Sequence, residues 1–139
     1  MTNLQLLCLL LALTTPVVIG LGTLQSVRFR ASLYCHQRPV SNAKVELFDK
    51  DRTDPDDLMA VGYTDRYGRI DLCGKEEEFT AIEPFVRIHH TCGEHCINIC
   101  KRETLIPIPQ CYVNDGDYAR KVYDVGAMEL SRKFEARPC

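Results

Sequence analysis

The sequence lacks several features that would each assign it to a familiar class of protein. After residue 22 no apolar run approaches the roughly 18 residues that a membrane-spanning helix needs. The formal net charge is −2, so the basic surplus expected of a general nucleic-acid-binding or anionic-membrane surface is missing. There is no N-x-S/T sequon, no low-complexity segment and no internal repeat. These absences exclude partners such as nucleic acid and predict an unglycosylated chain without a transmembrane segment.

The first 22 residues have the pattern of a secretory signal peptide. Leu4–Leu13 is apolar and uncharged, and small residues at Gly20 and Gly22 suit cleavage after either one. A membrane anchor is the alternative, but the flank that stops transfer is missing. We therefore predict a secreted, extracellular protein in which residues 23–139 form one domain, long enough to bury a core.

The chain after the leader alternates with the two-residue period of half-buried strands. In Ser26–Cys35 the odd-numbered positions are apolar and the even-numbered ones are mostly polar. Further strands are predicted at 43–47, 59–63, 70–72, 85–92, 97–106 and 121–130, with a bulge at Gly126. Lys75–Phe79 is a helical candidate too short to stand alone. About seven short strands separated by turns predict an all-β, two-sheet sandwich.

Cysteines outside the leader are numerous enough to expect disulfide bonds in an oxidising compartment. They are Cys35, Cys73, Cys92, Cys96, Cys100, Cys111 and Cys139. Cys92 and Cys100 flank the turn between two predicted strands and share a face by parity, so they are the favoured pair. The odd total leaves either one free thiol or an intermolecular bond.

Two segments suggest metal ions. His89–Cys100 holds cysteine and histidine at spacings loosely like those of zinc sites, although it matches no standard signature. Disulfide bonds are the simpler use of its cysteines. The acidic run Asp49–Asp57 offers carboxylates to calcium but lacks the glycine and glutamate of an EF-hand loop. A solvated loop beside a strand edge explains the same charges. We predict no metal and no cofactor.

Several motifs together resemble the nematode transthyretin-like family of secreted proteins. They are Gln25–Arg28, the Asp54–Asp57 loop, Gly62–Asp65, Gly68–Leu72, Phe85–Cys92, Ile108-Pro109 with Tyr112-Val113, and Tyr123–Gly126. The resemblance implies a transthyretin-like sandwich of eight strands in two four-stranded sheets. Family members often carry cysteines at positions matching Cys35 and Cys139, which implies a second disulfide between them. Past Leu130 the pattern departs, so a full last strand is not expected.

The same resemblance argues against two known activities of transthyretin relatives. Relatives that hydrolyse 5-hydroxyisourate use a histidine and an arginine on early strands, another histidine and a C-terminal Tyr-Arg-Gly-Ser. Here Val27–Ala31 contains no histidine and the chain ends Ala136–Cys139. The thyroid-hormone channel of the vertebrate protein needs last strands that this chain lacks. We therefore predict that the protein is not an enzyme.

The remaining interpretation is a secreted extracellular binding or signalling module, monomeric or dimeric, that recognises a protein or cell-surface partner. Outward-facing side chains of the first strand are the predicted binding residues, with two on the fifth strand as alternatives. They are Arg28, Arg30 and Tyr34, then Arg87 and His89. Two rival functions are a carrier of a lipid or small apolar ligand, and a divergent hydrolase that uses His90.

Overall fold

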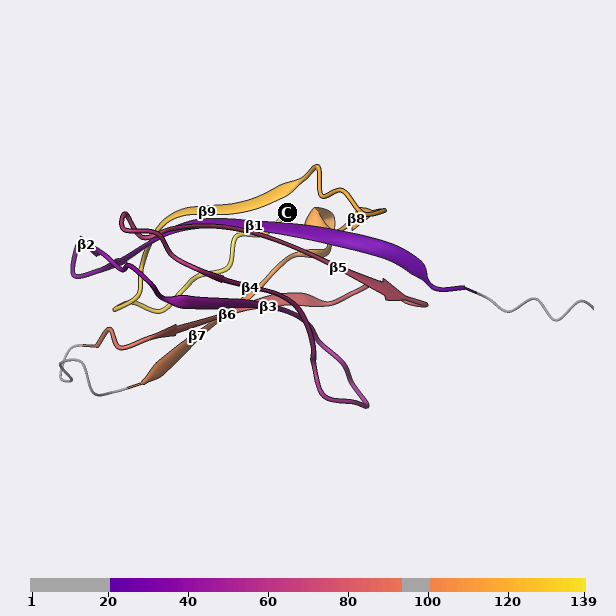
Figure 1. Ribbon diagram of the computed structural model, residues 1–139, viewed down its shortest axis with the longest axis horizontal. Helices are drawn as coiled ribbons and strands as arrows, with labels where there is room; N and C mark the ends of the chain where they lie inside the picture. The colour runs from indigo at the N-terminus through magenta and orange to yellow at the C-terminus, as the bar shows by residue number, and fades with distance from the viewer. Residues whose placement is uncertain (1–20, 94–100) are drawn as a thin grey trace, which may run out of the picture.

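The computed structural model describes residues 21–93 and 101–139, and these form a sandwich of two β-sheets (Figure 1). The strands are β1 (Thr23–Cys35), β2 (Arg38–Pro39), β3 (Lys44–Asp49), β4 (Asp57–Tyr63), β5 (Arg69–Glu78), β6 (Pro84–His90), β7 (Arg102–Pro107), β8 (Asn114–Asp115) and β9 (Val122–Glu129). A single 3-10 turn, η1 (Gln110–Tyr112), is the helical structure of these residues, none of which forms a helix long enough to cross a membrane.

In one sheet, which we call sheet A, β1 lies between β5 and β9. β5 pairs antiparallel with β1, whereas β9 pairs parallel with it, and the short β2 and β8 pair antiparallel with the two ends of β1. The other sheet, sheet B, has the order β4-β3-β6-β7 and is antiparallel throughout. The predicted all-β sandwich is confirmed, but its long strands divide three and four rather than four and four.

The core lies between the sheets and consists of the side chains on one parity of each strand. On β1 the predicted inward set is confirmed, since Val27, Phe29 and Leu33 are completely buried. The other inward side chains follow the same period: Val45 and Leu47 on β3, Ile70 and Leu72 on β5, Val86 and Ile88 on β6, Ile106 on β7, and Tyr123, Val125 and Met128 on β9. Burial of these apolar surfaces is the main driving force for this fold.

The turn before β5 follows from its sequence. The Asp65 carboxylate accepts hydrogen bonds from the N–H groups of Tyr67 (2.8 Å) and Arg69 (2.9 Å), which closes an Asx turn. Gly68 has a φ of 77°, and a Cβ there would collide with the carbonyl oxygen of Leu33. Glycine is therefore required where this turn packs against β1.

Three expectations about individual strands can be compared with the structure. Lys75–Phe79 forms no helix, because β5 continues through Glu78 as the antiparallel partner of β1. The bulge is confirmed: Gly126 has a φ of 68°, and the pairing of β1 with β9 shifts register there. The predicted sixth strand corresponds to β7, and its first part, 97–100, lies outside the described residues.

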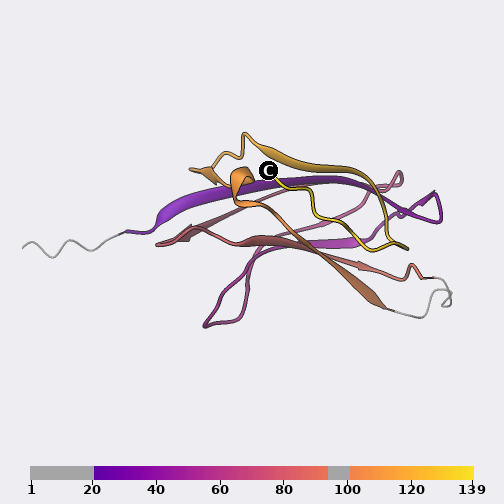
Figure 2. The same ribbon diagram turned by 180° about the vertical axis from the view of Figure 1, so that it is seen from behind.

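The expected absence of a full last strand is confirmed for the described residues. The segment 131–139 has no strand pairing and runs back beside β9 (Figures 1 and 2). Phe134 packs against the core, and the N–H of Arg137 donates to the hydroxyl of Tyr123 at 3.4 Å. A disulfide bond joins Cys139 to Cys111. This tail leaves β9 without a further strand beside it.

Candidate functional site

The side of sheet B that faces away from the core is the candidate site. Strand alternation and register place three side chains of each strand there. This outer face of sheet B consists of Lys44, Glu46 and Phe48, of Leu58, Val61 and Tyr63, of Phe85, Arg87 and His89, and of Glu103, Leu105 and Pro107. Leu58, Tyr63 and Leu105 are each more than half exposed, at 51%, 57% and 55%. Apolar side chains exposed together mark a surface that can bury them against a partner.

An aromatic stack with a cation on it lies on the two inner strands of this face, β3 and β6, toward one end of the sheet. The rings of Phe48 and Phe85, neighbours on β3 and β6, stack with centroids 5.3 Å apart and planes at 13°. The Arg87 guanidinium carbon lies 4.7 Å from the Phe48 centroid and 5.9 Å from that of Phe85. This geometry is that of a cation–π contact, which holds the planar guanidinium against the rings.

The hydrogen-bonding capacity of Arg87 is incompletely used. Its Nε is buried and has no hydrogen-bond partner within the described part of the chain. The nearest carboxylate oxygen, Oε2 of Glu103, is 3.7 Å from that nitrogen. A guanidinium favours planar, bidentate pairing with a carboxylate. The Nε itself is buried, so an additional anionic ligand would have to meet the part of the Arg87 side chain, 30% of its surface, that is exposed.

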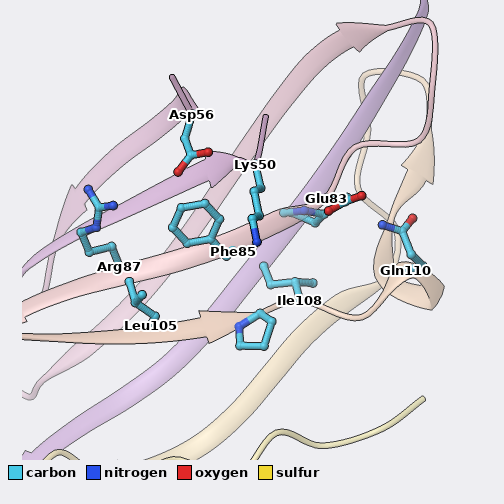
Figure 3. A pocket seen from close by; sticks show the side chains of 10 residues that line it. Lys50, Asp56, Glu83, Phe85, Arg87, Leu105, Ile108 and Gln110 are labelled. Atoms are coloured by element: carbon cyan, nitrogen blue, oxygen red, sulfur yellow. The ribbon is translucent and has the colours of Figure 1, made fainter. Parts of the chain in front are cut away.

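A pocket of about 430 Å³ opens at one end of the face (Figure 3). Its apolar lining comes from Pro84, Phe85, Leu105, Pro107 and Ile108, and its polar lining from Lys50, Asp56, Glu83, Arg87 and Gln110. Arg52 reaches Glu83 at 2.7 Å, so one of the two acidic groups is already paired. The pocket can receive an apolar side chain while its cations meet a neighbouring acidic group.

The other end of the face is polar. Nε2 of His89 lies 2.7 Å from Oε2 of Glu46, and its Nδ1 lies 3.4 Å from Oε1 of Glu103. Burial opposes ionisation of Glu46, but hydrogen bonds from His89 and Lys44 outweigh it and lower the pKa of that carboxyl. The structure thus brings the predicted residues Arg87 and His89 onto one face, Arg87 at its aromatic end and His89 in its ionic network.

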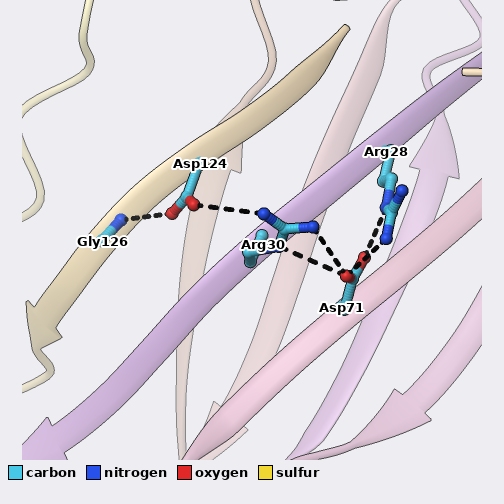
Figure 4. Close-up of polar contacts among 5 residues, drawn as sticks. All are labelled: Arg28, Arg30, Asp71, Asp124 and Gly126. Atoms are coloured by element: carbon cyan, nitrogen blue, oxygen red, sulfur yellow. Dashed lines mark hydrogen bonds and ion pairs between the residues drawn. The ribbon is translucent and has the colours of Figure 1, made fainter. Parts of the chain in front are cut away.

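The other predicted binding residues lie together on the outer face of sheet A, where an ion network occupies the arginines (Figure 4). Arg28 makes two 2.7 Å hydrogen bonds to Asp71. Arg30 reaches Asp71 at 3.1 Å and Asp124 at 3.8 Å. The bonds from Arg28 and Arg30 lower the pKa of Asp71, and Asp71 in turn raises the pKa of Arg28. The charges that suggested a binding surface are therefore neutralised within the chain.

Tyr34 occupies the same outer face near its end. It is half-buried, and its register neighbours are Pro39 on β2 and Glu129 on β9. The Glu129 carboxylate accepts hydrogen bonds from the N–H groups of His36 (2.9 Å) and Gln37 (3.1 Å). Burial by itself would raise the pKa of Glu129. These bonds and those from Ser131 outweigh burial and lower the pKa to about 2. This carboxylate fixes the turn after β1.

Both predicted disulfide pairings were wrong. Cys92 bonds to Cys35, at a Cα separation of 5.8 Å, and Cys139 bonds to Cys111, at 6.0 Å. The parity argument for Cys92 with Cys100 assumed that both belong to one hairpin. Cys92 instead lies beyond the end of β6, beside the end of β1 in the other sheet. Cys96 and Cys100 lie outside the described residues. Among the described residues, Cys73 is the free cysteine.

The zinc and hydrolase hypotheses both relied on residues that the structure uses otherwise. The Cys92 sulfur is bonded to Cys35, and 94–100 lies outside the described residues. The His90 ring faces inward, on the same side of β6 as Val86 and Ile88. Its Nδ1 accepts from the N–H of Cys92 at 3.1 Å, and its Nε2 lies 2.9 Å from the hydroxyl of Thr104. Burial, followed by the charge of Arg102, lowers the pKa of His90.

The acidic loop brings part of its predicted calcium ligands together. Carboxylates of Asp51, Asp57 and Glu78 lie within 4.8 Å of one another, and burial followed by the charge of Asp57 raises the pKa of Asp51. Asp49 points elsewhere, since it accepts from the N–H of Glu83 at 2.7 Å. Glu78, from β5, was not part of the sequence pattern. Calcium binding by this loop stays an untested alternative to the solvated loop, and no metal was predicted.

Sequence reasoning missed the aromatic centre of the site. Phe48 and Phe85 occupy strand positions of the parity expected to face solvent, and large apolar residues there were the available signal. The stack needs β3 beside β6 with Phe48 opposite Phe85, and this register is not written in either segment alone. Exposed Leu105 was likewise visible only as an apolar residue of an expected strand.

The fold defines this protein as a disulfide-bridged, two-sheet β-sandwich. Comparison with known proteins agrees with that description. A family model described as TTR-52, Transthyretin-like family, matches residues 30–109, and the chain belongs to the transthyretin-like family.

Individual relatives come from Caenorhabditis elegans. Transthyretin-like protein 5 is 38% identical over 96% of this chain and 97% of its own length. Transthyretin-like protein 2 is 35% identical over 100% of this chain and 99% of its own length. Transthyretin-like protein 46 is 33% identical over 79% of this chain and 62% of its own length.

Proposed function

We propose that this protein is a secreted, non-enzymatic recognition module that binds an extracellular or cell-surface protein through the outer face of sheet B. The observation that carries the proposal is the cluster of exposed apolar side chains around a stacked aromatic pair and a half-buried arginine. Exposed apolar side chains gathered on one face are a feature of interaction surfaces, and aromatic residues and arginine are enriched in them. On the outer face of sheet A, by contrast, the predicted binding residues Arg28 and Arg30 are already paired with Asp71 and Asp124.

The chemistry of the face suggests the chemistry of its partner. An apolar side chain of the partner fills the pocket beside Leu105 and Pro107, and a carboxylate of the partner pairs with Arg87. Desolvated anchors of these two kinds dominate the binding energy of protein interfaces. The polar end, with Lys44 and His89, forms the hydrated rim.

The proposal of a non-enzymatic role is supported by how the histidine of the hydrolase hypothesis is used. A general base needs a ring nitrogen within reach of a substrate proton. Both ring nitrogens of His90 already have partners, and its ring lies on the core side of β6. An assay with 5-hydroxyisourate that shows turnover above the uncatalysed rate would contradict this part of the proposal.

The face is tested with single charges placed on it. The secreted chain is coupled to a resin, cross-linked to extracellular and cell-surface proteins of its source organism, and each captured protein is then purified and its Kd measured. Leu105→Glu and Val61→Glu put a carboxylate at exposed positions, which should weaken binding at least tenfold. Ala127→Glu, on the exposed outer side of β9, is the matched control and should leave the Kd unchanged.

The outcomes separate the proposed face from its rivals. Loss of binding in Arg30→Gln, with binding intact in both face variants, would move the site to sheet A. A lipid that co-purifies stoichiometrically and is released by no face variant would favour a carrier. Binding that survives in Leu105→Glu and Val61→Glu alike would overturn the proposal.

A further inference from the structure

The edge of β5 differs from the other outer edges of the sandwich. On β4 and β9 the strand pairing shifts register, and β7 ends in Pro107. Bulges and prolines are the usual devices that keep a strand edge from pairing with another chain. β5 pairs with β1 over ten consecutive residues without a register shift and contains no proline. It therefore presents a straight and continuous edge.

The backbone groups on this edge can be assigned from one hydrogen bond. The N–H of Leu33 donates to the carbonyl of Gly68 at 2.7 Å, so this pair is hydrogen-bonded. In an antiparallel pair such bonds alternate along the strand. The N–H and C=O groups of Asp71, Cys73 and Lys75 consequently point away from β1, toward the open side of the sheet.

The side chains on the outer side of β5 have a self-complementary order of charge. Arg69, Asp71, Cys73, Lys75 and Glu77 follow one another at every second position. When a second β5 pairs antiparallel about Cys73, each arginine at 69 faces a glutamate at 77 and each aspartate at 71 faces a lysine at 75. Opposite charges in facing positions stabilise strand pairs, and by symmetry each such contact forms twice.

Three of these charges have no ion-pair partner among the described residues. Arg69, Lys75 and Glu77 take part in none of the ion pairs found among the described residues. On the inner side of β5, the same register sets Leu72 of one copy opposite Gly74 of the other. Because Gly74 has no side chain, the two β5 strands can approach each other there. We propose that this protein forms a symmetric dimer by antiparallel pairing of two β5 edges about Cys73, which joins two A sheets into one.

The interface lies at the edge of sheet A and leaves the outer face of sheet B open in both copies. It goes beyond the proposed recognition role and does not depend on it, since a failed dimer test leaves partner binding through sheet B unaffected. When both hold, the dimer presents two recognition faces, and linked sites raise the apparent affinity for a partner with repeated epitopes.

Charge exchange tests the pairing in the full secreted chain carrying Cys73→Ser, so that only non-covalent association is measured. Sedimentation velocity over a concentration series gives the dimer Kd. Arg69→Glu alone and Glu77→Arg alone each set like charges opposite one another twice, which should weaken the dimer about tenfold or more. The double variant Arg69→Glu/Glu77→Arg restores opposite charges and should recover the Kd of the parent.

Lys121→Glu is the matched control, because it changes the net charge as Arg69→Glu does at an exposed position away from β5. It should leave the dimer Kd unchanged, and circular dichroism verifies that each variant is folded. A parent chain that stays monomeric up to about millimolar concentration, the limit of weak specific association, would overturn the proposal. So would a double variant that associates as poorly as the two single ones.

In the native sequence, a disulfide bond between the Cys73 residues of two copies tests the register of the proposed strand pairing. Directly opposite residues of a hydrogen-bonded antiparallel pair have Cα atoms about 5.5 Å apart, within the range that a disulfide bridges. With oxidised glutathione added, the Cys73 thiolate displaces one glutathione thiolate and forms a mixed disulfide. The thiolate of the second copy's Cys73 then displaces the other, so two glutathione thiols are released for each new disulfide.

Non-reducing peptide mapping distinguishes the outcomes of this oxidation. A peptide in which Cys73 is joined to Cys73 of a second copy supports the register. Mixed disulfide with glutathione as the single product, in protein that sediments as a dimer, would contradict it. The structural bonds Cys35–Cys92 and Cys111–Cys139 serve as internal standards, because both remain in the map.

Discussion

The two outer faces of this sandwich are built from the same strand geometry but use their side chains in opposite ways. On sheet A, Arg28 and Arg30 are bound to the carboxylates of Asp71 and Asp124. On sheet B, exposed leucine, valine and tyrosine side chains surround an aromatic stack, and Arg87 lies against it with an Nε that has no hydrogen-bond partner among the described residues. The central arginines of one face are satisfied within the chain, whereas the central arginine of the other has a less complete set of partners.

This difference shows why charge in a sequence is a poor guide to a binding surface. Both Arg28 and Arg87 occupy outward positions of a strand, and from the sequence Arg28 was the preferred binding residue and Arg87 an alternative. The tertiary structure gives Arg28 two short hydrogen bonds to one carboxylate, whereas the Nε of Arg87 lies 3.7 Å from its nearest one. A binding surface is found where polar and apolar groups remain unpaired, and pairing is a property of the fold.

The largest expected effect comes from separating the two sheets that bear these faces. Cys35→Ser/Cys92→Ser removes the bond that joins the end of β1 to the segment after β6, 57 residues away. The free energy of unfolding should fall by about 2–4 kcal/mol, because the unfolded chain regains the freedom that the bond removes. Urea unfolding followed by circular dichroism measures it, with the exposed free thiol variant Cys73→Ser as control. A control that loses as much stability as the double variant would contradict the expectation.

A smaller effect, confined to acid, should come from Glu129 at the end of the sheet A face. Its pKa is about 2 when folded, against 4.5 for the ordinary side chain. A lowered folded pKa stabilises the protein above the unfolded pKa, and this contribution is lost as the pH falls from 4.5 toward 2. The Tm difference between the parent and Glu129→Gln should therefore be complete at pH 7 and shrink below pH 4.5.

Glu103→Gln provides the comparison on the outer face of sheet B, where that carboxylate is 54% exposed. Within the described residues, no backbone N–H donates a hydrogen bond to Glu103, whereas such bonds from His36 and Gln37 hold Glu129. Its variant should show a smaller Tm difference at pH 7. A Glu129→Gln difference that is the same at pH 7 and pH 3 would show that the bonds to His36 and Gln37 contribute nothing specific to the ionised form.

Breaking the ion network itself should cost less. Asp71→Asn removes the carboxylate that Arg28 and Arg30 share, and because Asp71 is 39% exposed the loss of stability should be at most about 1 kcal/mol. Salt screens exposed charges, so the loss should be greatest at low ionic strength and shrink in 1 M NaCl, where the screening length is about 3 Å. Urea midpoints at both salt concentrations measure this, with Arg52→Gln as the control for a single exposed pair. Equal midpoints for the parent and Asp71→Asn at low salt would show that the network adds no stability.

The smallest effect on stability should come from a substitution of an exposed apolar side chain on the outer face of sheet B. Leu105→Ser changes a side chain that is 55% exposed, so the free energy of unfolding should change by no more than about 0.5 kcal/mol. Retention on a hydrophobic-interaction column should nevertheless fall, because exposed apolar area is removed. The reciprocal change, Ser32→Leu on the outer side of β1, should increase retention. A loss above about 1 kcal/mol for Leu105→Ser would show that Leu105 is packed rather than available for binding.

The sequence by itself determined the local features of this protein. Alternation in Ser26–Cys35 identified the buried side of β1, and Asp65 with Gly68 identified the turn before β5. Gly126 marked the bulge of β9. These features depend on side chains within a few residues of one another, and so a short window of sequence contains all the information that they need.

The tertiary structure alone decided which distant residues meet. It paired Cys92 with Cys35 instead of Cys100, Asp71 with Arg28, and Phe48 with Phe85. Each of these contacts depends on the order and register of strands that are far apart in the chain. A two-residue period fixes which side of a strand is buried, but many strand orders share that period. The choice among them comes from packing the whole core at once.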